Sequence, residues 1–141
     1  MSGAEWSRFA GRHFYLDANV FIALLEGDAA RQARMRGLFA WIDRGDILAS
    51  TSALTLAEVL ALPLARGAKA TAAAYEARLA GVAQVLVNTA VLRAAARLCG
   101  EARMDLPDAI HVASAMQAGC DVLVTGDAGI VLPGEMDRVG V

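Results

Sequence analysis

The sequence predicts a single α/β domain over residues 1–141, built in three layers around a parallel sheet of four to five strands. Short strands that are apolar throughout alternate with segments of helical propensity, a pattern typical of parallel sheets covered on both faces. A chain of 141 residues can bury one hydrophobic core but is too short for two full lobes. Hydrophobic residues make up 57% and charged residues 20%, which excludes a disordered protein.

Four apolar segments are expected to form strands, and a fifth to form a short strand at the edge. The segments are His13–Leu16, Ile47–Ala49, Val82–Val87, Val122–Val124 and Arg138–Val141. Sheets of this class bind ligands outside the carboxyl ends of their strands. Residues that directly follow these segments are therefore the first candidates for a functional site.

Helices are expected between the strands, with their ends marked by capping and breaking residues. Ser52 and Thr89 are expected as N-caps, and Asp105 as the cap of a helix with Pro107 in its first turn. The helix that begins at Ser52 is expected to run through Leu62 and to be broken by Pro63 and Gly67, since proline cannot donate the backbone hydrogen bond of a helix interior. The expected helical segments are 18–26, 29–44, 52–62, 68–79, 89–101 and 105–118.

Charge, cysteine content and hydropathy narrow the functional classes. The net charge is −2, so contact with nucleic acid would need a local basic patch or a metal ion. Cys99 and Cys120 show no metal-binding or redox spacing and are expected to be reduced thiols in a cytosolic protein. The apolar segment 14–25 is too short to span a membrane and contains Asp17. We therefore expect a cytoplasmic protein without a signal peptide or a membrane partner.

Four isolated carboxylates stand where strands end or helices begin. Asp17 and Asp127 follow apolar strands, Asp108 lies at a helix start, and Glu58 lies in an apolar helix that is expected to be buried nearly all round. Burying a carboxylate is costly unless something compensates its charge. If the four side chains converge, a hard divalent cation with oxygen ligands is the natural compensation.

Each carboxylate also has an ordinary structural explanation. Asp17 could be only a helix N-cap, and Asp127 only a turn residue beside glycines. Asp105 and Asp108 could form a capping box. His111, one turn after Asp108, is expected to be a packed core residue, since no second histidine at helical spacing suggests zinc.

Several other classes lack their required motifs. No dinucleotide-binding, P-loop or nucleophile-elbow pattern is present. A phospho-aspartate receiver would be expected to use a lysine late in the chain, and the single lysine here is Lys69. A haloacid-dehalogenase-like phosphatase would place a second aspartate two residues after the first, where this chain has Asn19.

Four segments together resemble the PIN domains of VapC toxins. They are YLDANV (15–20), TSALTLAEVL (51–60), LPDAIHVASA (106–115) and LVTGD (123–127). The resemblance covers nearly the whole chain in the right order. It implies a magnesium- or manganese-dependent endoribonuclease, the toxin of a type II toxin–antitoxin pair, which cuts RNA and usually forms a homodimer. Neither the RNA nor the antitoxin is indicated by the sequence.

The resemblance also suggests roles for individual residues. Asp17 and Asp108 would be the first metal ligands, and Glu58 and Asp127 would complete the catalytic site directly or through water. Asn19 and Thr125 would contact these ligands without binding the metal ion themselves. Which of the many arginines contact RNA stays open.

Two alternatives to the toxin function remain. A housekeeping RNA-processing nuclease or a non-catalytic binding module could use the same fold, although the presence of all four acids favours an enzyme.

The dimer or antitoxin surface is expected on the second helix. There, four side chains either are exposed or face the domain's own core: Met35, Leu38, Phe39 and Trp41.

Overall fold

The structure is a computed structural model that describes residues 3–127, 129–130 and 132–141. A parallel sheet of five strands, in the order β3-β2-β1-β4-β5, lies at its centre. This confirms the expected fold class, including the edge strand. The strands are β1 (His13–Leu16), β2 (Leu48–Ser52), β3 (Ala83–Val85), β4 (Val122–Thr125) and β5 (Asp137–Gly140).

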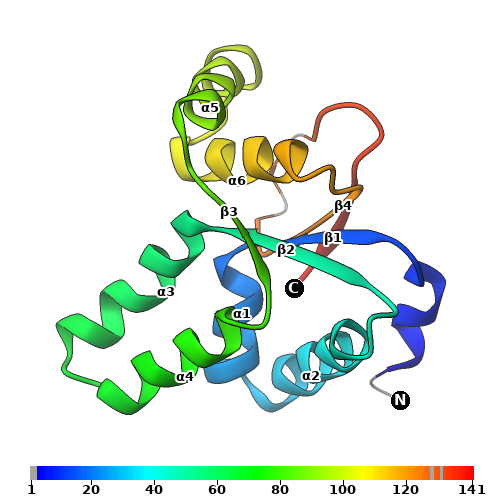
Figure 1. Ribbon diagram of the computed structural model, residues 1–141, viewed down its shortest axis with the longest axis vertical. Helices are drawn as coiled ribbons and strands as arrows, with labels where there is room; N and C mark the ends of the chain where they lie inside the picture. Colours follow the sequence, from blue (N-terminus) through cyan, green and yellow to red (C-terminus); the bar gives the residue numbers. More distant parts are fainter. Residues whose placement is uncertain (1–2, 128, 131) are drawn as a thin grey trace.

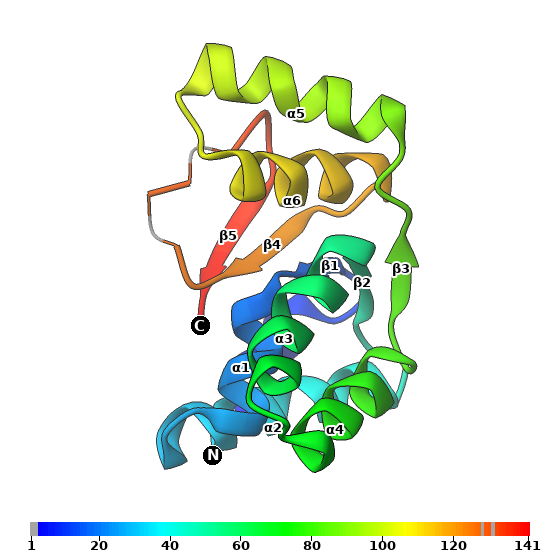
Figure 2. The same ribbon diagram turned by 90° about the vertical axis from the view of Figure 1, so that its left-hand side faces the viewer.

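Helices cover both faces of the sheet, as Figures 1 and 2 show. One layer contains α1 (Ala18–Glu26), α2 (Ala29–Asp43), α3 (Ala53–Ala65) and α4 (Lys69–Leu79). The opposite layer contains α5 (Thr89–Ala102) and α6 (Leu106–Gln117), which pack against each other. A short 3₁₀ helix, η1 (Ala4–Phe9), precedes β1 and was not expected from the sequence.

The central strands β1 and β4 are largely apolar because each sheet face meets a different helical layer, whereas β2 ends in buried Ser and Thr residues and β3 and β5 are largely exposed. On β1, Phe14 and Leu16 join the core under α1 and α2, whereas Tyr15 points to the opposite face and packs with α6. On β4, Val124 and Leu123 divide between the two faces in the same way. Alternation of side chains along a strand makes both positions buried, so neither can be polar without a partner.

The strand order creates a switch point between β1 and β4. The chain adds β2 and then β3 on one side of β1, and returns to add β4 and β5 on the other side. The two connections that leave β1 and β4 diverge at the carboxyl edge, which leaves a crevice where such folds bind ligands. Asp17 and Gly126, which directly follow these two strands, lie there.

Two expected N-caps have the predicted position but form no capping hydrogen bond, and the third is shifted by a residue. Asn88, not Thr89, caps α5, and its side chain accepts a hydrogen bond from the N–H of Val91. Ser52 and Asp105 occupy N-cap positions, but neither side chain forms a capping hydrogen bond. The expected capping box is therefore absent, and Asp108 is free of that role.

Pro63 does not end α3, which continues to Ala65. The helix ends at Gly67, whose φ of 67° allows paired hydrogen bonds back to the last turn. The N–H of Ala68 donates to the carbonyl of Pro63, and the N–H of Gly67 donates to that of Leu64. A proline costs only its own missing hydrogen bond, whereas a left-handed glycine redirects the chain.

Helix α3 is less buried than its composition suggested. Only one stripe, formed by Thr55, Val59 and Pro63, is buried. Leu62 and Leu64 are 54% and 62% exposed, so the expectation of a helix buried nearly all round was wrong. Glu58 lies at the border of the buried stripe and not within a fully apolar surrounding.

The second helix does not present the expected apolar surface. Met35, Leu38 and Phe39 are buried in the main core, and Trp41 is half-buried against it. The alternative in which these residues face the domain's own core is therefore the correct one. The core extends further than expected because η1 adds Trp6 and Phe9, which pack edge-on against Phe14.

Candidate active site

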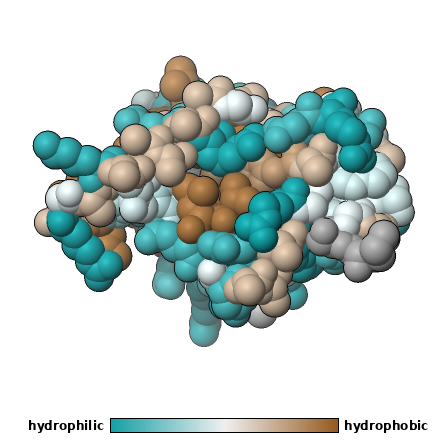
Figure 3. Space-filling model, turned by 90° about the horizontal axis from the view of Figure 1, so that it is seen from below, coloured by the Kyte–Doolittle hydropathy of each residue, from teal (hydrophilic) through white to brown (hydrophobic). Residues whose placement is uncertain are grey.

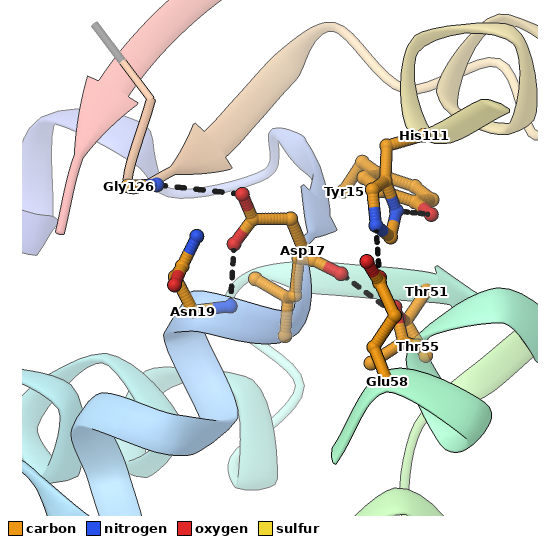
Figure 4. A network of polar contacts seen from close by, with 9 residues as sticks. Tyr15, Asp17, Asn19, Thr51, Thr55, Glu58, His111 and Gly126 are labelled. Carbon is orange, nitrogen blue, oxygen red and sulfur yellow. Dashed lines mark hydrogen bonds and ion pairs between the residues drawn. The ribbon is translucent and has the colours of Figure 1, made fainter. Parts of the chain in front are cut away.

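Asp17 lies at the end of β1, where it is 4% exposed. It is the N-cap of α1: its Oδ1 accepts a hydrogen bond from the N–H of Asn19 over 2.9 Å. Its Oδ2 accepts a second one from the N–H of Gly126 over 3.3 Å (Figure 4). Burial raises the pKa of Asp17, and these hydrogen bonds and Thr125 only partly oppose the rise. Asp17 is thus a cap and also a buried carboxylate at the switch point.

Glu58 and His111 form a direct contact between α3 and α6. The Nε2 atom of His111 lies 2.5 Å from Oε1 of Glu58, and its Nδ1 atom lies 2.7 Å from the hydroxyl of Tyr15 (Figure 4). The His111 side chain is 5% exposed, whereas that of Glu58 is 32% exposed. The glutamate therefore reaches outward from a buried histidine.

Asp108 and Asp127 form a second pair. Both line a hollow of about 170 Å³ near the start of α6. Burial raises the pKa of Asp108 to about 6, helped by a hydrogen bond and charge repulsion from Asp127. The N–H of Gly129 donates to Oδ1 of Asp127 and, with the bond to Asp108, lowers the pKa of Asp127. The negative charge of Asp127 disfavours ionisation of Asp108, so the two carboxyl groups titrate together.

The two supporting residues expected from the sequence both lie beside Asp17. The hydroxyl of Thr125 accepts a hydrogen bond from the N–H of Asp127 over 3.0 Å, and its proximity also lowers the pKa of Asp17. The side chain of Asn19 packs against the backbone of Gly126. Thr125 thus contacts the backbone of Asp127 and lies near the carboxylate of Asp17.

The four acids lie at one edge of the sheet, joined in pairs. Asp17 touches the turn that carries Asp127, and Asp127 contacts Asp108. His111 contacts Glu58 and lies close enough for its charged form to lower the pKa of both Asp17 and Asp108. Within the residues that the structure describes, no three acidic, histidine or cysteine side chains are close enough to hold a metal ion together.

The chemistry of these groups nevertheless suits a hard divalent cation. The candidate donors are carboxylate oxygens, which Mg²⁺ and Mn²⁺ prefer, and Mg²⁺ usually takes only one or two of them and keeps several waters. The raised pKa values of Asp17 and Asp108 indicate carboxylates without enough positive charge nearby. A cation would supply that charge, so the residues fit the group.

His111 was expected to be a packed core residue, and the hydrogen bonds of its ring were not predicted. It is buried, but both ring nitrogens have polar partners. The available signal was its spacing: Asp108 and His111 are three residues apart, so they share one face of α6. Its partner Tyr15 carried no signal, since it alternates with core residues on a buried strand.

Comparison with known protein families assigns the fold. Residues 14–132 match the family model described as the PIN domain. The chain belongs to the PIN-domain family. A search of curated proteins finds no match. Among the described residues of this PIN domain, no helix is long and apolar enough to cross a membrane.

Solved structures of toxin–antitoxin systems share this PIN fold. VapBC2 from Rickettsia felis, bound to a DNA fragment from its promoter, has a TM-score of 0.74 at 11% identity over 91% of this chain and 98% of that one. VapC20 from Mycobacterium tuberculosis, a toxin that cleaves the sarcin–ricin loop, has a TM-score of 0.65 at 20% identity over 78% and 86%. A toxin–antitoxin complex from Klebsiella pneumoniae has a TM-score of 0.63 at 22% identity over 86% and 98%.

Proposed function

We propose that this PIN domain is a Mg²⁺- or Mn²⁺-dependent endoribonuclease and the toxin of a toxin–antitoxin pair. One observation carries the proposal: a buried carboxylate, Asp17, lies at the switch point of the sheet and accepts the N–H of Gly126, in the turn that leads to Asp127. Structural carboxylates are usually exposed or paired with a basic side chain. Acidic groups that are buried, close to one another and raised in pKa are typical of catalytic sites.

Each residue of the proposed site has a separate role in the hydrolysis of a phosphodiester. A bound divalent ion would supply a water of lowered pKa and would neutralise charge on the phosphate. Asp17 and Asp108 would hold the ion, and Glu58 and Asp127 would complete the site or hold its waters. Thr125 keeps the turn in place by accepting the N–H of Asp127, and the N–H of Gly126 holds Asp17 from the other side.

RNA cleavage in the presence and absence of metal tests the catalytic proposal. The wild-type protein is expected to cut single-stranded or loop RNA with Mg²⁺ or Mn²⁺ and to stop when EDTA is added. Asp17→Asn and Asp108→Asn are expected to reduce cleavage to background. Asp46→Asn, which changes an exposed aspartate paired with Arg44, is the matched control and should retain full activity. Equal cleavage in EDTA, or full activity in both site variants, would contradict the mechanism.

The partner is proposed to be a small antitoxin protein, and the active form a homodimer. The exposed apolar residues Ile22, Leu62 and Leu64 lie in the layer of α1 to α4 and are candidates for the contact surface. Figure 3 shows this side of the molecule, with a hydrophobic patch surrounded by hydrophilic residues. Exposed apolar clusters of this kind commonly mark protein contacts. The solved toxin–antitoxin complexes with the same fold support this choice of partner.

Light scattering and co-expression separate this proposal from a housekeeping nuclease. A toxin is expected to arrest growth when expressed alone and to be neutralised by a small protein encoded beside it. A housekeeping nuclease would cut RNA with the same metal dependence but would need no such partner. A strict monomer at high concentration would contradict the homodimer.

A further inference from the structure

Beside the acidic edge lies a line of three polar groups, two of which are buried and have no role in the proposed mechanism. It begins at the hydroxyl of Tyr15, passes through the ring of His111 and ends at the carboxylate of Glu58 (Figure 4). Tyr15 is fully buried on β1, His111 is nearly so on α6, and Glu58 reaches solvent from α3. Three elements that are distant in sequence therefore meet at one side chain of the proposed site.

The directions of these hydrogen bonds follow from the chemistry of the groups. An ionised carboxylate only accepts hydrogen bonds, so the Nε2–H of His111 must donate to Oε1 of Glu58. When the ring is neutral, Nδ1 carries no hydrogen and accepts from the Tyr15 hydroxyl, which is an O–H donor. The two contacts together select the tautomer with hydrogen on Nε2.

This geometry leaves one carboxylate oxygen of Glu58 available to bind a metal ion. Oε1 is occupied by His111, while no hydrogen bond within the described residues uses Oε2. A glutamate that is 32% exposed would otherwise sample several rotamers. The contact with a buried, doubly bonded ring limits those rotamers to ones that keep the carboxylate at the acidic edge.

Packing against the apolar residues of α6 does not by itself explain a histidine at position 111. Val112 and Ala115 pack with Tyr15 in one apolar cluster, but the buried hydroxyl of Tyr15 needs a polar partner. A buried histidine is tolerated because both nitrogens are satisfied, and only one of its partners is interior. The second partner is a residue of the proposed site.

We propose that His111 is a positioning residue that, with Tyr15 behind it, orients the carboxylate of Glu58 for binding the metal ion. The inference rests on the proposed nuclease function. Groups that hydrogen-bond a metal ligand fix its orientation, and their loss commonly lowers metal affinity by about 10–100-fold. His111 does not itself touch the ion or the substrate.

Two substitutions of His111 separate its two hydrogen bonds. The amide of His111→Gln reaches the place of Nε2 and can still donate to Glu58. The amide of His111→Asn reaches only the place of Nδ1, so it keeps Tyr15 and loses Glu58. Mn²⁺ affinity measured by calorimetry is expected to fall about 10-fold or more in His111→Asn and to stay within about 3-fold in His111→Gln.

The control is the other histidine of the chain. His13 hydrogen-bonds Ser50 through Nε2, and it lies at the opposite end of β1 from Asp17. His13→Asn should leave Mn²⁺ affinity unchanged. In a Glu58→Gln background, His111→Asn should cause no further loss, since its effect acts through Glu58. Far-ultraviolet circular dichroism and the melting temperature establish that each variant is folded.

A spectroscopic measurement on the unmodified protein remains decisive if His111→Asn fails to fold. Long-range ¹H–¹⁵N correlation of the His111 ring is expected to show hydrogen on Nε2, with an Nε2 shift that changes in Glu58→Gln. A ring with hydrogen on Nδ1 alone would overturn the inference. Equal Mn²⁺ affinity in wild type and folded His111→Asn, or equal losses in the Asn and Gln variants, would also overturn it.

The same titrations distinguish a failed inference from a failed function. If Asp17→Asn and Asp108→Asn lose Mn²⁺ binding while His111→Asn keeps it, only the role of His111 is wrong. If all three variants bind Mn²⁺ like the wild type, the proposed metal site itself is wrong.

Discussion

The backbone N–H of Gly126 donates to Oδ2 of Asp17 over 3.3 Å, which joins the turn after β4 to the end of β1. This approach depends on the absence of a side chain at residue 126. A β-carbon there would lie 2.8 Å from Cγ and Nδ2 of Asn19 and 3.0 Å from its Cβ, contacts that side chains do not tolerate. Gly126 thus allows Asp17 and Asn19 to occupy the switch point together.

We expect Gly126→Ala to lower the free energy of unfolding by about 1–2 kcal/mol, because Asn19 must move to admit the new methyl group. The double variant Asn19→Ala/Gly126→Ala should lose less than the sum of the single variants, since the two closest contacts, with Cγ and Nδ2, are removed and only the one with Cβ remains. Urea denaturation measures both.

The control for this series is Gly100→Ala. Gly100 lies in α5 with open space around it, so alanine there should be neutral or stabilise by up to about 1 kcal/mol. If Gly126→Ala is as stable as the wild type, the close packing of Asn19 on the turn is not rigid.

The raised pKa of Asp108 predicts a fall in stability with rising pH when no divalent metal is present. Its pKa is about 6 in the folded protein and 3.8 is the ordinary value, so between these two pH values the folded state binds more protons than the unfolded state. Protons then stabilise the fold, and the free energy of unfolding decreases as the pH rises from about 4 to about 6. Asp17, whose pKa is also raised, contributes with the same sign.

Asp108→Asn should remove part of this dependence and make the metal-free protein more stable at pH 7. We expect about 1 kcal/mol, less than the full shift implies, because Asp108 is partly exposed and solvent screens its charge. Thermal melting from pH 4 to pH 7 in EDTA gives the comparison. Asp121 and Asp127, whose pKa values are lowered, contribute with the opposite sign, so the test is the difference between the two proteins. The same pH dependence in wild type and Asp108→Asn would show that Asp108 does not titrate as its surroundings imply.

Divalent metal should stabilise the folded protein at neutral pH. Mg²⁺ or Mn²⁺ binds the native carboxylates and not the unfolded chain, so a concentration 100 times the dissociation constant adds about 2.7 kcal/mol. Differential scanning fluorimetry should show a higher melting temperature with millimolar metal than with sodium chloride of equal ionic strength. Asp17→Asn and Asp108→Asn should abolish the increase, and a wild-type melting temperature indifferent to metal would count against a preformed site.

Local and periodic features were predictable because their causes lie close together in the sequence. The apolar strands, the helices between them and the parallel sheet all follow from hydropathy patterns, and the structure confirms them. The proximity of Asp17 to the turn carrying Asp127 was also predictable, since both follow strands that meet at one edge. Errors arose where two local signals competed: Pro63 seemed to end α3, but the left-handed Gly67 ends it.

Contacts between distant elements were decided only by the tertiary structure. Nothing near Met35 or Leu38 in the sequence reveals whether their helix turns toward the core or toward solvent, and packing buries them. His111 likewise appears in sequence as one polar residue on an alanine-rich helix. The role of this histidine depends on β1 and α3, which bring Tyr15 and Glu58 within hydrogen-bonding distance. The sequence by itself determined that Asp17 and Asp127 follow strands and stand at one edge of the sheet, because strand ends are local features. Only the folded chain decided which side chains orient them, because a hydrogen bond requires two groups to be within about 3 Å regardless of their separation in sequence.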